Sequence, residues 1–196
     1  MAHAPATSAD AAPDDTELMR RVRASDEAAF GVLMGRWEKP VKAVIGRLVL
    51  NTGEAEELAQ ETFVRVWQHR DRFEPGRAVK PWILGIAVNL ARNRLRWWRR
   101  RPVVSLDAWT EDGRDGAIAA GTPAAGAALE QAERAAAVRE AIAALPLTLR
   151  EALVLFEYED LSHQEIALAV GATPKAVETR IARARAGLRV ALKRWL

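Results

Sequence analysis

The stretch LSHQEIALAVGATPKAVETRI, residues Leu161–Ile181, predicts two helices joined by a tight turn. Ser162 is a good N-cap for the first helix, and Thr173 followed by Pro174 combines an N-cap with proline at the first helical position of the second. Gly171 lies where the turn needs a residue that tolerates positive φ. These signals together predict a helix-turn-helix, whose second helix can enter the major groove of DNA.

The predicted second helix and the chain that follows it are strongly basic. Residues 173–196 contain seven basic side chains and a single acid, Glu178. The basic residues are Lys175, Arg180, Arg183, Arg185, Arg189, Lys193 and Arg194. A basic excess of this kind can neutralise DNA phosphates. The same charges would also suit a solvated face of a helical hairpin, but their coincidence with the caps and the turn glycine favours contact with DNA.

A second basic tract lies near the middle of the chain. Residues 92–101 include six arginines and no acid, with Trp97 and Trp98 interleaved among them. Arginine pairs with phosphates and stacks on bases, and tryptophan stacks on unpaired bases. Asn89 and Asn93 lie four residues apart and can present their amides on one helical face. The tract predicts contact with nucleic acid, although a solvated helix end with tryptophans in the core would show the same pattern.

An acidic stretch precedes this tract and predicts a helix with one buried face. The acids are Glu54, Glu56, Glu57 and Glu61. The expected buried positions are Ala55, Leu58, Ala59, Thr62, Phe63 and Val66. Acids stabilise helix N-termini through the helix dipole, and this effect alone can explain these four residues. However, Val64 is an apolar residue outside the buried stripe, and an exposed face of this kind can contact a partner protein.

Composition excludes several classes of protein. Hydrophobic residues make up 49% of the 196 residues and charged residues 28%, which excludes uniform disorder. There is no cysteine, the three histidines lack metal-ligand spacing, and no phosphate-binding glycine loop or Ser/His/Asp arrangement is evident. No apolar run approaches the roughly 18 residues of a membrane span, and no signal peptide is recognisable. We therefore expect a cytoplasmic, non-enzymatic protein with no metal, no cofactor and no membrane insertion.

The small net charge of +3 is a near-cancellation between segments of opposite sign. Residues 72–101 carry nine basic side chains and one acid, and residues 173–196 carry seven and one. These two segments together amount to +14, so the rest of the chain amounts to −11. Positive charge is therefore concentrated in the two segments that are predicted to meet nucleic acid.

The fold class predicted from these patterns is all-α, because β-branched runs are short and never alternate. We expect two small helical domains over residues 15–101 and 127–196, joined by a flexible linker over 102–126 that is rich in alanine, glycine and proline. Residues 1–14 are expected to form a disordered arm. Pro40 lies inside the pattern of a long helix and predicts a kink or break there.

Three segments in this order resemble the extracytoplasmic-function (ECF) sigma factors of bacterial RNA polymerase. EAEELAQETFVRVW (Glu54–Trp67) looks like the region 2 helix that docks on the largest polymerase subunit. RFEPGRAVKPWILGIAVNLARNRLRWWRR (Arg72–Arg100) is similar to the part of region 2 that opens and reads the −10 element. The segment Ala144–Arg189, which includes the helix-turn-helix, is similar to region 4, which reads the −35 element.

The resemblance implies a sigma factor that binds core RNA polymerase and directs promoter-specific initiation. The implied polymerase contacts are Glu57, Gln60, Glu61, Val64 and Arg65. The implied −10 contacts are Arg77, Lys80, Trp82, Asn89, Asn93, Arg94, Arg96 and Trp97. The implied −35 contacts are Thr173, Pro174, Lys175, Glu178, Thr179, Arg180 and Arg183. It also implies an anti-sigma factor or another regulator that masks these surfaces.

Departures from the family pattern occur at several positions, and one of them is His163, which stands where tyrosine is frequent. Glu178 replaces a residue that is commonly basic, and a glutamate can accept a hydrogen bond from cytosine N4. Asp160 stands where glycine is frequent, and Asn93 where aspartate is frequent. Two alternatives also fit the residues: a one-component transcription regulator that binds duplex DNA through the helix-turn-helix, and a structural helical adaptor.

Overall fold

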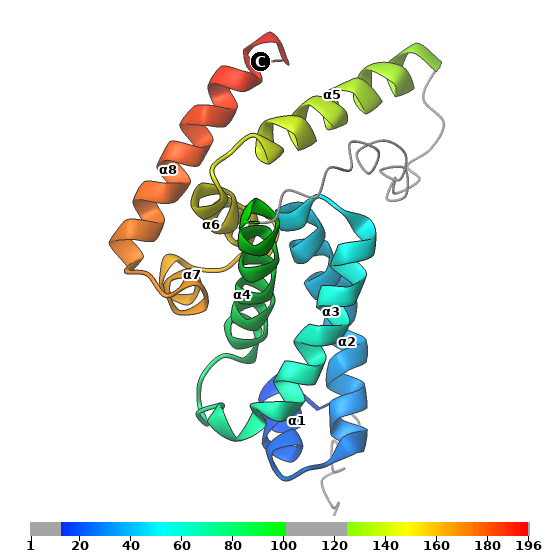
Figure 1. Ribbon diagram of the computed structural model, residues 1–196, viewed down its shortest axis with the longest axis vertical. Coiled ribbons are helices and arrows are strands. Elements are labelled where there is room, and N and C mark those ends of the chain that lie inside the picture. Colours follow the sequence, from blue (N-terminus) through cyan, green and yellow to red (C-terminus); the bar gives the residue numbers. More distant parts are fainter. Residues whose placement is uncertain (1–12, 101–124, 196) are drawn as a thin grey trace, which may run out of the picture.

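The computed structural model describes residues 13–100 and 125–195, and these two ranges are helical and contain no strand (Figure 1). The all-α prediction is therefore confirmed. Most of the predicted arm and of the predicted linker lies outside the described residues. Ala125 and Gly126, which composition places in the linker, are the first two residues of a helix.

The described helices fall into two groups, which we call the N-terminal and C-terminal bundles. The N-terminal bundle contains α1 (Asp15–Arg23), α2 (Glu27–Val49), α3 (Thr52–Gln68), a short 3₁₀ helix (Arg70–Arg72) and α4 (Val79–Arg100). The C-terminal bundle contains α5 (Ala125–Ala143), α6 (Leu147–Glu157), α7 (His163–Val170), α8 (Pro174–Ala191) and a terminal 3₁₀ helix (Lys193–Trp195). The predicted buried stripe of α3 is confirmed in full.

Side-chain caps define where the first three helices begin. Asp14, Asp26 and Asn51 each accept a hydrogen bond from the backbone N–H three residues further on, at 2.7, 2.9 and 2.9 Å. Such caps satisfy donors that have no partner within the helix, and each contributes about 1 kcal/mol. The residue at which each of these three helices begins is therefore decided by local sequence.

The break that Pro40 predicts does not occur, because α2 continues from Glu27 to Val49. A proline inside a helix removes one backbone hydrogen bond and costs about 3 kcal/mol. On either side of Pro40, however, α2 buries large residues such as Trp37 and Val44 in the core. Each such burial contributes roughly 1.5–3 kcal/mol, so packing offsets the proline.

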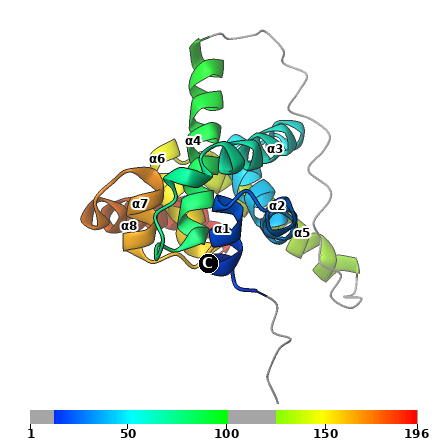
Figure 2. The ribbon, with the colours of Figure 1, turned by 90° about the horizontal axis from the view of Figure 1, so that it is seen from below.

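Helix α4 is the central element of the fold. It packs against α2 and α3 on one side and against α7 on the other, so it lies between the two bundles (Figure 1). Its buried residues are Val79, Pro81, Ile83, Leu84, Gly85, Ala87, Val88 and Ala91. Beyond Ala91 no residue of α4 is fully buried and only the half-buried Leu95 and Trp98 still pack against the core, and the last turns project from the rest of the molecule (Figure 2).

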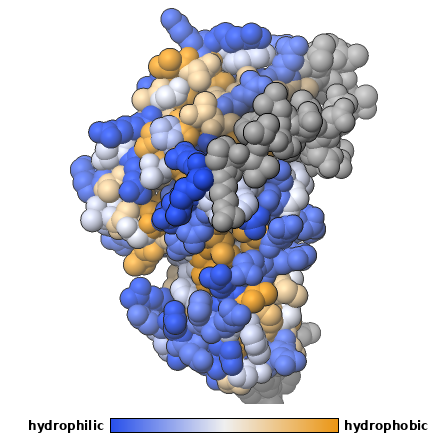
Figure 3. Space-filling model, in the orientation of Figure 1, coloured by the Kyte–Doolittle hydropathy of each residue, from blue (hydrophilic) through white to orange (hydrophobic). Residues whose placement is uncertain are grey.

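The two bundles share one continuous hydrophobic core, which runs from Leu18 in α1 to Ile181 in α8. A smaller cluster of Ile142, Leu145, Leu153 and Ala184 joins α5, α6 and α8. On the face seen in Figure 3, hydrophilic residues predominate and hydrophobic residues form separate patches. The two predicted domains are thus packed against each other.

Arg150 connects the ends of two helices from different bundles. Its guanidinium donates to the carbonyl oxygen of Leu48 at the end of α2, at 2.8 Å, and to that of Leu145 at 3.2 Å. It also donates to the carbonyl oxygen of Ala143, the last residue of α5. Helix C-termini carry partial negative charge, so a buried cation is stabilised there. Burial lowers the pKa of the Arg150 guanidinium.

Replacement of this cation tests its structural role. Arg150→Ala leaves three carbonyl oxygens without their shared donor and should lower the free energy of unfolding by about 2 kcal/mol. The matched control is Arg139→Ala, which removes an exposed arginine from α5 and should have little effect. Urea denaturation followed by circular dichroism measures both. Equal stability of the two variants would contradict the bridging role.

Candidate nucleic-acid interface

The helix-turn-helix forms as the sequence predicts. Ser162 caps α7 in a reciprocal arrangement: its Oγ accepts from the N–H of Glu165 at 3.3 Å, and the Glu165 carboxylate accepts from the N–H of Ser162 at 2.8 Å. The Ser162 hydroxyl also donates to the Glu165 carboxylate at 2.7 Å, and this bond, together with the one from the Ser162 N–H, lowers the pKa of Glu165. Gly171 ends α7 with φ of 67°, and Thr173 caps α8 by accepting from the N–H of Ala176 at 3.2 Å. The caps, the turn glycine and Pro174 at the helix start are all confirmed.

One face of α8 packs inward and the opposite face is left to solvent. Val177, Ile181 and Ala184 are buried. Of the predicted −35 residues, Arg180 is half-buried, and the exposed ones are Thr173, Pro174, Lys175, Glu178, Thr179 and Arg183. The structure therefore brings the predicted set together on one accessible surface.

Glu178 is an ionised acceptor on this surface. Its carboxylate accepts from the Lys175 ammonium at 2.9 Å, and this hydrogen bond holds the pKa of Glu178 below its usual range. Because the pair offsets both charges, Arg180 and Arg183 carry the remaining positive charge of the predicted −35 set. The carboxylate remains available to accept from a base edge.

Asp160 adopts a left-handed conformation with φ of 51° just before the helix-turn-helix. Glycine populates this region without strain, and aspartate is one of the few other residues that tolerate it. The geometry therefore accounts for both residue types at this position. The departure from glycine leaves the turn intact.

The predicted −10 residues spread along α4 and the turn before it. Arg77 pairs with Glu74 at 2.6 Å within the turn, which Gly76 forms with φ of 85°. Trp82 is half-buried, and its ring meets the ring of Phe73 edge-on with centroids 5.3 Å apart. Lys80 pairs across the bundles with Glu159, at 3.4 Å. These three residues therefore each have a structural partner.

Four of the five remaining −10 residues lie on one side of α4, and the fifth, Arg94, is half-buried. Asn89, Asn93, Arg96 and Trp97 are exposed, and their spacing of four, seven and eight residues places them along a single face. The side-chain carbonyl of Asn93 accepts from the Arg96 guanidinium at 2.7 Å. Trp97 exposes 46% of its surface, which is unusual for so large an apolar side chain.

A groove between α3 and α4 is lined by residues from two predicted surfaces, the polymerase contacts and the −10 contacts, which the sequence analysis treats separately. It measures about 780 Å³, and its lining includes the predicted polymerase contacts Glu57, Glu61 and Arg65 together with the predicted −10 residues Asn93, Arg94 and Trp97. Arg94 pairs with Glu54 and, at 3.6 Å, with Glu57. Glu61 pairs with Arg65 at 2.7 Å. The two predicted surfaces are therefore contiguous.

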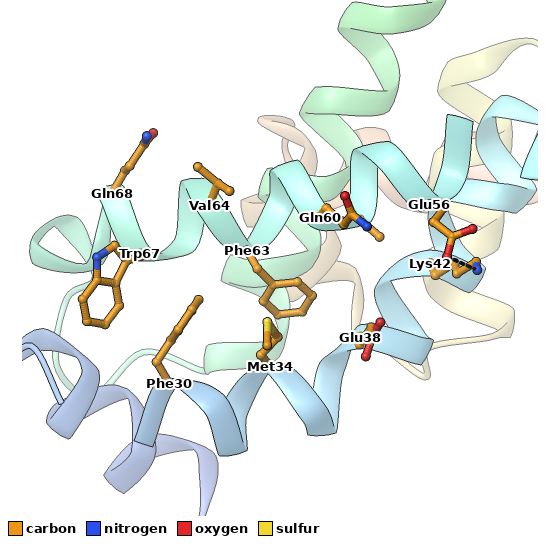
Figure 4. Close-up of a pocket in the computed structure, with 11 residues that line it drawn as sticks. Phe30, Met34, Glu38, Lys42, Glu56, Gln60, Phe63, Val64, Trp67 and Gln68 are labelled. Carbon is orange, nitrogen blue, oxygen red and sulfur yellow. Dashed lines mark ion pairs between the residues drawn. The ribbon is translucent and has the colours of Figure 1, made fainter. Parts of the chain in front are cut away.

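A second groove, between α2 and α3, contains residues that sequence reasoning does not single out (Figure 4). It measures about 390 Å³, and Phe30, Met34, Phe63 and Trp67 point into it from the two helices (Figure 4). Lys42 and Glu56 pair at 3.2 Å at one end. Gln60 and Val64, two predicted polymerase contacts, also line this groove. The exposed Val64 is the sequence signal that could have located it, because it lies outside the buried stripe of α3.

Within residues 13–100 and 125–195, no group of three or more potential metal ligands comes together. Over the same ranges, no helix is both long enough and apolar enough to cross a bilayer.

The two tryptophans of α4 should differ in their contribution to stability. Trp82→Ala removes a half-buried ring packed on Phe73 and should lower the free energy of unfolding by about 2 kcal/mol. Trp97→Ala removes an exposed ring and should change it by less than about 1 kcal/mol. Urea denaturation compares the two, with Trp82→Phe as a control that keeps an aromatic ring. A similar loss for both alanine variants would place Trp97 in the core.

Comparisons with known proteins agree with this arrangement. Residues 33–101 match Sigma-70 region 2, and residues 135–188 match Sigma-70 region 4. The chain is 33% identical over 174 residues to the ECF RNA polymerase sigma-E factor of Escherichia coli K12, covering 87% of this chain and 90% of that protein.

Two solved structures resemble the chain over most of its length. CnrH in complex with the cytosolic domain of CnrY gives a TM-score of 0.67 at 26% identity, covering 91% of this chain and 97% of that one. The sigma factor RpoE of Bartonella quintana, in complex with the anti-sigma factor NepR, gives 0.64 at 26% identity, covering 84% and 96%. The chain therefore belongs to the extracytoplasmic-function family of RNA polymerase sigma factors.

Proposed function

We propose that this sigma factor uses three surfaces, on α3, α4 and α8, to bind core RNA polymerase and to direct it to promoters. The observation that carries the proposal is that the exposed face of α8 and the exposed end of α4 each gather the predicted DNA contacts. The N-terminal bundle is then region 2 and the C-terminal bundle region 4. In this proposal the protein binds polymerase and DNA and opens the strands in the cytoplasm, and it catalyses no reaction of its own.

Region 4 places α8 in the major groove of the −35 element. Thr173 at the start of the helix, Glu178 and Thr179 are exposed and can reach base edges, whereas Arg180 and Arg183 are suited to phosphates. Because Glu178 is held ionised by Lys175, it acts as an acceptor toward cytosine. This side of the helix therefore reads sequence, and the arginines fix its register.

Region 2 holds the −10 element with the last turns of α4. Asn89 and Asn93 offer amides to the edges of unpaired bases, and Arg96 meets phosphates. Trp97 offers a ring on which an unstacked base can pack. Trp82 packs on Phe73 from its half-buried position and so supports the turn that contains Arg77.

Core polymerase docks on the outer side of α3. Glu57, Gln60, Glu61 and Arg65 form the polar part of this surface, and Val64 adds an exposed apolar side chain. The α2–α3 groove extends the surface with an apolar floor of Phe63 and Trp67, flanked by Met34. The acids around it favour a basic or mixed-charge helix of the polymerase as the occupant. An anti-sigma factor, such as the one bound to the similar RpoE, would block docking by covering the same surface.

Loss of the two α8 arginines should weaken promoter binding. In Arg180→Ala/Arg183→Ala, two phosphate contacts disappear, so the salt-dependence slope of holoenzyme binding should fall by about 2 and affinity by about tenfold. The control Arg134→Ala/Arg139→Ala removes two exposed arginines of α5. Binding to a promoter fragment is measured at several salt concentrations, with a scrambled −35 element as the reference. An unchanged slope would remove α8 from the −35 contact.

Charge reversal on α3 should prevent docking. Glu57→Lys/Glu61→Lys replaces two acids by cations that would face the basic or mixed-charge helix of the polymerase. Binding of core polymerase should therefore weaken at least about tenfold. The control is Glu130→Lys/Glu133→Lys on α5, which changes charge equally at two exposed positions. Binding to purified core enzyme and run-off transcription measure the effect. Normal binding by the α3 variant would place the docking surface elsewhere.

A further inference from the structure

The basic residues of the proposed −10 set differ in the charge of their partners. Arg77 pairs with Glu74 at 2.6 Å, and Lys80 pairs with Glu159 at 3.4 Å. Arg94 pairs with two acids of α3. A carboxylate at ion-pair distance offsets much of the positive charge that a cation offers to a phosphate. These three cations are therefore weakened as DNA contacts by their own partners.

Arg96, in contrast, has a neutral partner. Its guanidinium donates to the Oδ1 atom of Asn93 at 2.7 Å. Over residues 13–100 and 125–195, no acid forms an ion pair with Arg96. Both side chains are exposed. Because an amide carries no charge, this hydrogen bond orients the guanidinium and leaves its positive charge intact.

The same hydrogen bond fixes the direction of the Asn93 amide. A guanidinium has only N–H donors, so the amide oxygen faces Arg96 and the amide nitrogen points away from it. The two N–H groups of that nitrogen then remain for an acceptor outside the pair. Asn93 and Arg96 lie three residues apart on one face of α4, next to the exposed Trp97. The pair therefore presents mainly donors to solvent, which suits phosphate oxygens and the acceptor atoms of bases.

An equivalent pair one turn earlier gives a different result. Asn89 accepts from the Arg92 guanidinium at a longer distance, 3.4 Å. Arg92 also donates twice to the carboxylate of Glu151, at 3.0 and 2.7 Å, and Glu151 is fully buried. The charge of Arg92 is therefore offset by a carboxylate in the core. Of the two pairs, Asn93–Arg96 combines an oriented guanidinium with an undiminished charge.

We propose that Asn93 is a positioning residue, which orients Arg96 without neutralising it and so makes Arg96 the main phosphate contact among the proposed −10 residues. This inference rests on the proposed function, because the −10 surface is part of that proposal. A guanidinium that is already held loses less side-chain freedom when a phosphate binds. An aspartate at position 93 would hold Arg96 equally well, but its charge would offset that of the guanidinium and repel the phosphate. The neutrality of the amide is therefore the property that this position requires.

Replacement of Asn93 by its charged isostere tests the proposal. The probe is the labelled non-template strand of a promoter fragment that the holoenzyme transcribes, and its binding to holoenzyme is measured at several salt concentrations. Arg96→Ala should lower the salt-dependence slope by about 0.7, the value for one phosphate contact on a single strand, and the affinity about fivefold at about 0.1 M salt. Asn93→Asp should reproduce at least about half of this decrease in slope. Asn93→Ala removes the hydrogen bond but adds no charge, so it should lower the affinity about twofold and leave the slope unchanged.

Two further variants separate the effect of charge from other causes. In Asn93→Asp/Arg96→Ala the aspartate has no cation to offset, so its effect on the slope should largely disappear. Gln131→Glu changes the net charge equally at an exposed position of α5, outside the proposed surfaces, and should leave the slope unchanged. Circular dichroism during urea denaturation shows that each variant is folded. If Asn93→Asp binds the probe with the slope and affinity of the unmodified chain, Asn93 has a structural role alone and the proposal is overturned.

The outcomes separate failure of this inference from failure of the proposed function. A holoenzyme that directs no promoter-specific transcript overturns the proposed function before any variant is compared. If transcripts form but Arg96→Ala leaves the slope unchanged, Arg96 contacts no phosphate and the inference fails. If Arg96→Ala lowers the slope and Asn93→Asp does not, the inference also fails, while the proposed function stands. A lower slope in both single variants, with no added effect of aspartate in the double variant, supports it.

Discussion

The close approach of the α4 and α7 backbones at Gly85 is the constraint on which the arrangement of this molecule depends. With a hydrogen in place of a side chain, α4 can bury one side against α2 and α3 and the other against α7. The result is a single core shared by two bundles. Beyond Ala91 the same helix keeps only Leu95 and Trp98 against that core, so its exposed side chains there are accessible while its first turns hold the fold together.

Charge that is segregated along the chain is partly neutralised in space. The arginines of α4 belong to a tract without acids, yet Arg92 pairs with Glu151 and Arg94 with Glu54 and Glu57. Arginine count alone therefore overstates the positive charge that α4 offers to DNA. Of the proposed −10 residues, Asn93, Arg96 and Trp97 lie where the helix is open. On α8, the Lys175–Glu178 pair has a similar effect, so Arg180 and Arg183 carry the remaining positive charge of the proposed −35 set.

Local signals predicted a large part of the fold. Ser162, Gly171, Thr173 and Pro174 each act within a few residues of their own position, and all take the predicted roles. The buried stripe of α3 follows from helical periodicity alone. Of the two outcomes predicted at Pro40, a kink or a break, the break does not occur, because burial of Trp37 and Val44 against distant parts of the chain outweighs one lost hydrogen bond. The α2–α3 groove was missed because its lining comes from two helices and only Val64 signals it in sequence.

The sequence by itself determined the helices, their caps, the helix-turn-helix and the family, because each depends on short-range spacing or on ordered motifs. Only the tertiary structure decided that the two bundles pack together, that residues of the proposed polymerase and −10 sets line one α3–α4 groove, and that Lys80 is paired with Glu159. These features join residues far apart in the chain. They depend on shape and charge complementarity between whole helices, and nothing in the spacing of residues along a single segment encodes them.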